Sequence, residues 1–299
     1  MTSDKVIHAL QFGQSGQLAS ALIGAAAPHV KITPVARSEV DFFVPNAAAR
    51  RIENEGRVDV VVNAVAYTGV DQAEREPGLA QAVNAIAPGL IAQSCAQRGI
   101  PLVHVSTDYV FDGSKPSAYV ETDPVSPINM YGQTKCHGED LIRTAWARHV
   151  IIRTSWLYAA QGTNFVKTIL RLAASRDELK VVNDQWGNPT SARDLADAIL
   201  SVVRHITAAP GANSWGTFHY AGAGRTNWCH FAETIVEEAE KVTPKMARIV
   251  PIPSSEFPTA ARRPKNSTLD CTKLETIYGI SPRPWFESVK TVMHDILTQ

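Results

Sequence analysis

Residues 6–19, VIHALQFGQSGQLA, decide the fold. Their first seven residues form a short, mostly apolar run that stops at Gly13, and an Ala-rich segment of helical composition, 17–27, follows directly. A strand that ends in a glycine turn and leads at once into a helix is the opening unit of many parallel α/β sheets. We therefore expect strands and helices to alternate along the chain.

The rest of the first half continues this alternation. Apolar runs are separated by segments of helical composition, and parallel strands need such crossover helices. One run, VDVVVNAVA at 58–66, is nearly unbroken, which is typical of a central strand covered on both faces. The expected strands are 6–12, 30–36, 58–66, 101–111 and 149–158; the expected helices are 17–27, a stretch up to Gly99 that Pro77 and Pro88 divide, and 131–146.

Past residue 158 the pattern loosens, and proline-rich connections intervene. Helices are expected at 164–176, 191–205, 227–241 and 285–297. We predict an α/β fold with a doubly wound, Rossmann-like parallel sheet and a smaller C-terminal substrate-binding lobe. The expected division is a dinucleotide-binding domain at 1–158, with returning elements near 191–224, and an interleaved substrate-binding lobe at 159–299.

Composition narrows the class of protein. The chain has 299 residues, and its 29 basic and 29 acidic side chains cancel, so no broad basic surface is available for nucleic acid or an anionic membrane. The four cysteines are scattered without a CxxC pair, which predicts reduced thiols and no metal site. The chain shows neither a signal-peptide pattern nor an apolar run of membrane-spanning length. We expect a cytoplasmic protein.

The glycine turn at 13–19 has the form GxxGxxA. Gly13 and Gly16 permit a tight turn and a close approach of the backbone to a pyrophosphate at the helix N-terminus. Ala19 replaces the usual third glycine and is still small enough for close packing of helix on strand. Because this loop follows the first strand, we expect it to bind a dinucleotide.

The end of the second strand indicates which dinucleotide. An NAD-specific enzyme usually carries an acidic residue there, whereas this sequence has Arg37 and Ser38. A guanidinium and a hydroxyl suit a 2′-phosphate, which predicts NADPH as the cofactor, although NADH could also be accepted. Asp41 and Phe42, just beyond, are expected to flank the adenine.

Two further segments predict catalytic residues. Tyr131 and Lys135 are four apart at the start of a predicted helix, so their side chains share one face. An ammonium beside a phenol would lower the phenol pKa, and Tyr131 could then protonate the oxygen of a ketone as hydride reaches its carbon. The apolar run at 101–111 turns polar at its carboxyl end, where Thr107 could donate a hydrogen bond to that carbonyl.

Taken together, these motifs resemble the dTDP-4-dehydrorhamnose reductases, a family of extended short-chain dehydrogenase/reductases. The resemblance covers nearly the whole chain, and its most specific part is STDYVFDG followed by PINMYGQTK. It also rests on FGQSGQLA, VVNAVAYTGVDQAEREP, IIRTSWLY, NDQWGNPT and RRPKNSTLD.

The resemblance implies the roles of individual residues. Thr107, Tyr131 and Lys135 would form the catalytic set, and Asp108 and Trp156 would contact the sugar nucleotide. Arg263 would contact a substrate phosphate. The residues expected at the cofactor are Gly13, Gly16, Gln17, Leu18, Arg37, Ser38, Asp41, Phe42, Ala64, Ala66, Tyr67, Thr68, Val105, Tyr131 and Lys135.

Two features depart from the family pattern. Tyr67 stands where many relatives have histidine, so the cofactor contact there would differ. Some relatives dimerise around magnesium held by glutamates of two helices, but the matching stretches here contain Ser20 and Arg193. We therefore expect no metal, and a monomer or a weak homodimer.

Three functions remain open on the sequence. The first is NADPH-dependent reduction of the 4-keto group of dTDP-4-dehydro-L-rhamnose to dTDP-L-rhamnose, which would serve the synthesis of cell-surface polysaccharide. The second is the same chemistry on another nucleotide-linked deoxy-4-ketohexose. The third is a non-catalytic, NADP-binding regulatory subunit of the same fold, which would not need the Thr–Tyr–Lys set.

Overall fold

The computed structural model describes residues 6–44, 46–243 and 245–298. Its central sheet has the strand order β10-β5-β4-β3-β1-β2, and every pairing in it is parallel. The chain runs from β1 outward to β2 and then continues from β3 in the other direction, so the sheet is doubly wound, as predicted. The strands are β1 (Ile7–Phe12), β2 (Val30–Val35), β3 (Val60–Asn63), β4 (Leu102–Thr107), β5 (His149–Thr154) and β10 (Gly216–His219).

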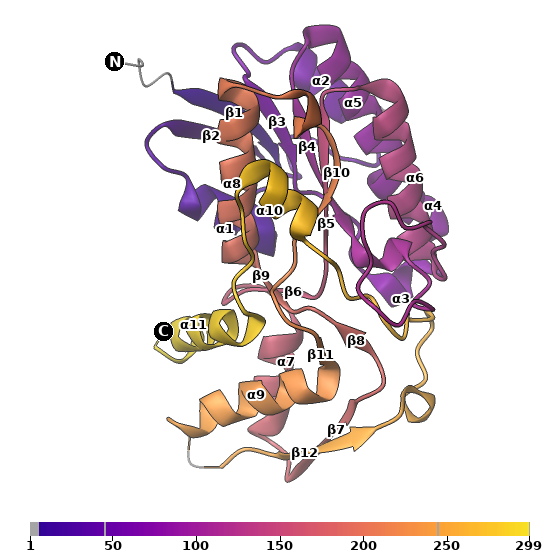
Figure 1. Cartoon of the computed structure of the whole chain (residues 1–299), viewed down its shortest axis with the longest axis vertical. Helices are drawn as coiled ribbons and strands as arrows, with labels where there is room; N and C mark the ends of the chain where they lie inside the picture. The colour runs from indigo at the N-terminus through magenta and orange to yellow at the C-terminus, as the bar shows by residue number, and fades with distance from the viewer. Residues whose placement is uncertain (1–5, 45, 244, 299) are drawn as a thin grey trace.

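Helices cover both faces of this sheet (Figure 1). On one face Leu22 and Ile199 pack in a core with Val103 of the sheet, and on the other face Ile91 and Ile142 pack in a second core. Both faces of the sheet are therefore buried, which explains why the strands have nearly continuous apolar sequences. The helices are α1 (Gln17–Ala25) and α8 (Ala192–Ala208) on the first face, and α2 (Ala47–Glu53), α5 (Ala87–Arg98) and α6 (Met130–Ala145) on the second.

A smaller group of elements lies below the carboxyl ends of the strands in Figure 1 and has its own apolar core. Within it, β7 and β12 form a parallel pair. Its members are β6 (Leu157–Tyr158), α7 (Phe165–Ala173), β7 (Glu178–Val182), β8 (Trp186–Gly187), β9 (Thr190–Ser191), β11 (Thr226–Asn227), α9 (Trp228–Glu240), β12 (Arg248–Ile252) and α11 (Trp285–Leu297). Between these segments the chain returns to the sheet through α8, β10 and α10 (Thr272–Tyr278).

Three strands are shorter than expected by more than one residue, each for a local reason. β3 ends at Asn63, whose Oδ1 accepts a hydrogen bond from the amide of Val65 and turns the chain out of the sheet. β4 ends at Thr107, whose hydroxyl caps a 3-10 turn at Asp108–Val110. The run expected at 149–158 is interrupted at Trp156, which has a φ of 45°. Thr107 and Trp156 both line a cavity at this edge of the sheet.

Pro77 begins a helix as expected, but Pro88 does not divide the stretch, so that expectation is wrong. α4 (Pro77–Gln81), a π-helical turn (Ala82–Ile86) and α5 follow one another with helical backbone angles throughout. Proline has no backbone N–H to donate inside a helix. The π-helical turn just before Pro88 is wider than an α-helical turn, so no hydrogen-bond donor is needed at that position. A short α3 (Val70–Ala73) precedes them.

No helix in the described ranges is both long and apolar enough to cross a membrane.

Candidate active site

A cavity of about 770 Å³ lies at the carboxyl ends of the sheet strands and extends to the smaller lobe. Nearly all residues proposed from the sequence line it: Gly13, Gly16, Gln17, Leu18, Arg37, Asp41, Phe42, Ala64, Ala66, Tyr67, Thr68, Val105, Thr107, Asp108, Tyr131, Lys135 and Trp156. Ser38 and Arg263 are absent from its lining. Arg263 instead donates to the carboxylate of Asp71 at 2.7 Å, which occupies its guanidinium.

The glycine loop is built to receive an anion. Gly13 has a φ of +102°, and a Cβ there would lie 3.3 Å from Ala19, so both small residues are needed for this close approach. Gly16 caps α1 without a side chain, so the amides of the first turn keep no side-chain acceptor. These features fit a dinucleotide pyrophosphate at the helix N-terminus.

Two side chains outside the glycine pattern hold this loop in place. Gln11, inside β1, donates to the carbonyl oxygens of Gly13 and Ala19 at 2.9 and 3.0 Å. Asn164, which caps α7, donates to Oε1 of Gln17 at 2.8 Å and so joins the loop to the smaller lobe. Sequence reasoning missed both; a glutamine within an otherwise apolar strand was the available signal for the first.

Arg37 lines the cavity just beyond the end of β2. Its guanidinium lies over the ring of Phe43, 5.5 Å from the centroid, which leaves an exposed cation at the cavity wall. Asp41 accepts a hydrogen bond from the Phe43 amide at 2.9 Å, and this contact fixes the turn. Arg37 thus presents a cation at this wall, whereas Ser38, expected beside it, is not part of the lining.

Tyr67 is fixed by contacts at both its backbone and its ring. Asn84 accepts from the Tyr67 amide at 2.8 Å and donates to its carbonyl at 3.1 Å. The phenol donates to Glu76, and this hydrogen bond raises the pKa of Tyr67 to about 12. Asn84, a positioning residue with no recognisable motif around it, lies in the π-helical turn before Pro88.

Thr107 and Tyr131 meet in the middle of the cavity. Removal of the Tyr131 phenol from water raises its pKa to about 12, while its hydrogen bond with Thr107 acts in the opposite direction. The expected lowering of this pKa by Lys135 is not found, because burial raises the pKa and Lys135 is not among the groups that shift it. At neutral pH the phenol keeps its proton, as a proton donor must.

Asp108 adds a second acid beside them. Thr107 donates to Oδ1 of Asp108 at 3.0 Å, and the Ser267 hydroxyl also acts on this carboxyl and lowers its pKa, while Oδ2 is buried without a close partner among the described residues. Burial raises the pKa of Asp108 to about 7. A polar group of a ligand is the natural partner for such an oxygen, because an unpaired buried acceptor is costly.

Lys135 is 1% exposed and makes two contacts through its amine. Nζ donates to the carbonyl oxygen of Val105 at 2.7 Å and lies 3.2 Å from Nε2 of His104. Burial lowers the pKa of Lys135 to about 8. His104 was not selected from the sequence; it is the single titratable residue inside the apolar run 102–105, and that was the signal.

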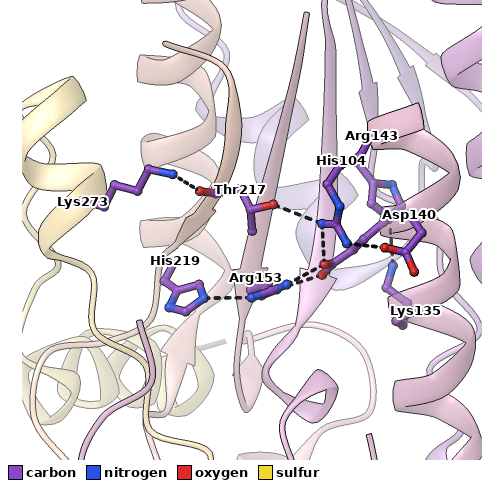
Figure 2. A network of polar contacts seen from close by, with 9 residues as sticks. His104, Lys135, Asp140, Arg143, Arg153, Thr217, His219 and Lys273 are labelled. Atoms are coloured by element: carbon purple, nitrogen blue, oxygen red, sulfur yellow. Dashed lines mark hydrogen bonds and ion pairs between the residues drawn. The ribbon is translucent and has the colours of Figure 1, made fainter. Parts of the chain in front are cut away.

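A buried ion pair lies one helical turn beyond Lys135, in the network that Figure 2 shows. Arg153 of β5 donates to both carboxylate oxygens of Glu139, at 2.9 and 2.7 Å, and Arg143 donates to the same carboxylate at 3.0 Å. Arg153 also lies 3.5 Å from His219. This network ties α6, which carries Tyr131 and Lys135, to the sheet.

Aromatic residues form the wall from the smaller lobe. Trp156 stacks on Trp228 with ring centroids 3.5 Å apart and an interplanar angle of 9°. A Cβ on Gly187 would lie 2.6 Å from the Trp156 ring, so that glycine makes room for it. The positive φ of Trp156 is rare for a bulky residue and aims its ring into the cavity.

In the ranges 6–44, 46–243 and 245–298, no three His, Cys, Asp or Glu side chains converge as ligands for a metal ion. Arg193 is exposed in the first turn of α8, and Ser20 donates to the carbonyl of Gln14.

Comparisons with known proteins agree with this geometry. The family model described as RmlD substrate binding domain matches residues 7–298. The dTDP-4-dehydrorhamnose reductase of Sinorhizobium fredii is 41% identical over 287 residues, which is 96% of this chain and 97% of the relative.

Solved structures give the same result. A dTDP-4-dehydrorhamnose reductase from Clostridium acetobutylicum has a TM-score of 0.90 at 35% identity and covers 98% of this chain and 100% of its own. The enzyme of Bacillus anthracis, solved in complex with NADP, has a TM-score of 0.88 at 32% identity and covers 97% and 99%. The chain therefore belongs to the RmlD substrate-binding-domain family, the family of the dTDP-4-dehydrorhamnose reductases.

Proposed function

We propose that this protein is an NADPH-dependent reductase that converts the 4-keto group of dTDP-4-dehydro-L-rhamnose to the alcohol of dTDP-L-rhamnose. The observation that carries the proposal is the convergence of Thr107, Tyr131 and Lys135 in one cavity with the glycine loop of α1. Relatives more than 35% identical bear the name of this enzyme, and a structural neighbour was solved with NADP.

In this proposal each residue of the cavity has a separate role in the reduction. NADPH, when bound along the glycine loop with its extra phosphate at Arg37, supplies the hydride. Tyr131, protonated at neutral pH, gives its proton to the ketone oxygen as that oxygen becomes negative. Thr107 lies beside the phenol and orients the same oxygen, while Asp108 accepts a hydrogen bond from a sugar hydroxyl through its unpaired Oδ2.

The two lobes have different roles in this proposal. Residues 1–158, with the returning segments near 191–224, hold the dinucleotide, and residues 159–299 supply most of the wall for the sugar nucleotide, with Trp156 at the boundary. Arg263 is proposed to reach a substrate phosphate only after it leaves Asp71. The protein acts in the cytoplasm as a monomer or weak homodimer, without a metal, and its four cysteines are free thiols.

The test is a direct assay. Purified protein is mixed with NADPH and dTDP-4-dehydro-L-rhamnose, the loss of reduced cofactor is followed by absorbance, and the product is identified by NMR. A rhamnose product supports the proposal, and an alcohol of the opposite configuration contradicts it. Turnover only with another nucleotide-linked deoxy-4-ketohexose assigns the second function. Tight binding of NADP without turnover assigns the regulatory function.

A further inference from the structure

A line of polar side chains runs behind the catalytic lysine, from the end of β3 through β4 to α6. Nδ2 of Asn63 lies 3.1 Å from Nδ1 of His104, and Nε2 of His104 lies 3.2 Å from Nζ of Lys135. All three side chains are at most 1% exposed. Asn63 and His104 must satisfy their donors and acceptors within the protein, because they are buried away from the cavity, whereas Lys135 also lines it.

The position of the proton on His104 follows from its neighbours. Oδ1 of Asn63 accepts from the Val65 amide at 3.1 Å, which fixes the orientation of the Asn63 amide. Nδ2 of Asn63 therefore donates to His104, and Nδ1 of His104 must be the acceptor. A neutral imidazole carries one N–H, so the proton lies on Nε2, the nitrogen that faces Lys135. Burial lowers the pKa of His104 well below its ordinary value, which keeps the ring neutral.

This arrangement constrains Lys135. An ammonium has donors only, so an N–H of His104 would oppose it, whereas a neutral amine can accept from His104 and donate to Val105. The other charged or titratable groups facing the pair are Glu139, on the next turn of α6, and His149 of β5. Glu139 favours the ammonium, but its carboxylate is already paired with two arginines.

We infer that His104 is a positioning residue that presents its Nε2–H to Lys135 and stabilises the neutral amine, so that Lys135 releases its proton readily. The inference rests on the proposed function. When Tyr131 has given its proton to the ketone oxygen, the phenolate takes a proton that leaves Lys135 as the neutral amine, and the amine regains a proton from solvent. A lysine held as a permanent cation would resist this step.

Two variants distinguish the contributions of the two ring nitrogens of His104. His104→Asn keeps a polar group at the position of Nδ1, near Asn63, but none near Lys135. His104→Gln places its amide near the position of Nε2 and restores a contact with Lys135. His137→Asn, a change at an exposed residue of α6, the helix that carries Lys135, serves as the matched control.

The first readout does not depend on turnover. Lysine labelled with ¹³C at Cε is incorporated, the Lys135 signal is assigned by its loss in Lys135→Met, and its pKa is measured by NMR. We expect the Lys135 pKa to rise by about one unit or more in His104→Asn, since the opposing N–H is gone, and to stay near the wild-type value in His104→Gln and His137→Asn. In wild type, ¹⁵N NMR of His104 should show the proton on Nε2.

The second readout is the pH profile of kcat. If the ammonium form of Lys135 is the active form, the alkaline limb moves upward by about the same one unit in His104→Asn, with less than about a threefold change in KM for NADPH. A proton on Nδ1, or a Lys135 pKa unchanged in His104→Asn, overturns the inference. If His104→Asn does not fold, the tautomer of His104 in wild type decides. A wild-type protein without turnover would instead refute the proposed function and leave the NMR result to judge His104.

Discussion

The carbonyl oxygen of Asn84 rests on Gly138 of α6, so closely that a Cβ at Gly138 would lie 2.1 Å from it. Asn84 belongs to the π-helical turn and also holds the backbone of Tyr67 at the cavity. The approach of these two helical segments therefore sets the position of a cavity wall as well as the packing of α6.

Gly138→Ala should destabilise the protein by about 1–3 kcal/mol or more, because backbone atoms cannot yield as a flexible side chain can. Gly24→Ala is the matched control: it lies in α1 with open space around its Cβ, and should stabilise the fold by roughly 0.5–1 kcal/mol. Urea unfolding of both variants measures the difference. Equal stability of the two variants would show that α6 can move away from Asn84.

Tyr131→Phe should lower kcat by about 10²–10⁴-fold, because the ketone oxygen loses its proton donor. Binding of NADPH should persist, since the glycine loop and Arg37 are untouched. Tyr158→Phe removes a buried hydroxyl that has no hydrogen-bond partner in the described residues, and it should keep full activity. Steady-state rates and a fluorescence titration with NADPH separate catalysis from binding. A Tyr131→Phe enzyme with a third of the wild-type kcat would refute the assignment.

Arg37→Ala should weaken the preference for NADPH over NADH. A charge-assisted contact with the extra phosphate is worth roughly 1.5–3 kcal/mol, which corresponds to about a 10- to 150-fold change in affinity. The rate with NADH should change little. Arg50→Ala, at an exposed arginine of α2 outside the cavity, is the control. Equal kcat/KM for both cofactors in wild type, unchanged in Arg37→Ala, contradicts this prediction.

Treatment with EDTA should change neither activity nor particle mass. Magnesium requires oxygen ligands, and the positions where some relatives place glutamates carry Ser20 and Arg193, whose guanidinium would repel the ion. Light scattering and the reductase assay, each with and without chelator, test both halves of the prediction. A dimer that dissociates when magnesium is removed would mean that other carboxylates bind the ion.

The fold could be predicted because its signals are local. A strand buried on both faces reads as an apolar run, and the turn at Gly13 needs a glycine. The parallel pair of β7 and β12 was not predicted, because its strands are short, partly exposed and 70 residues apart in register. The continuation of the helix through Pro88 was not predicted, because a π-helical turn has no recognisable sequence pattern.

The site could be predicted only in part, for a different reason. The spacing of four residues in a helix places Tyr131 and Lys135 on the same face. The polar end of the strand before that helix predicts that Thr107 lies near them. Nothing in the spacing shows that Asn63 faces His104, because that contact joins two strands through the register of the sheet. Ser38 and Arg263 remain predictions that the geometry does not bring to the cavity, and the roles of the other residues await the variants above.

The hydrogen bond from Asn164 to Gln17 means that the loop that receives the cofactor and the loop that opens α7 share one contact. A ligand that draws the Gln17 side chain toward itself breaks this contact, while the hydrogen bond from Asn164 to the carbonyl oxygen of Ala159 remains. If the loss of the contact shifts the second loop, binding in one lobe is thermodynamically coupled to binding in the other. Such coupling is reciprocal: by whatever factor the cofactor changes the affinity for the sugar nucleotide, the sugar nucleotide changes the affinity for the cofactor by the same factor.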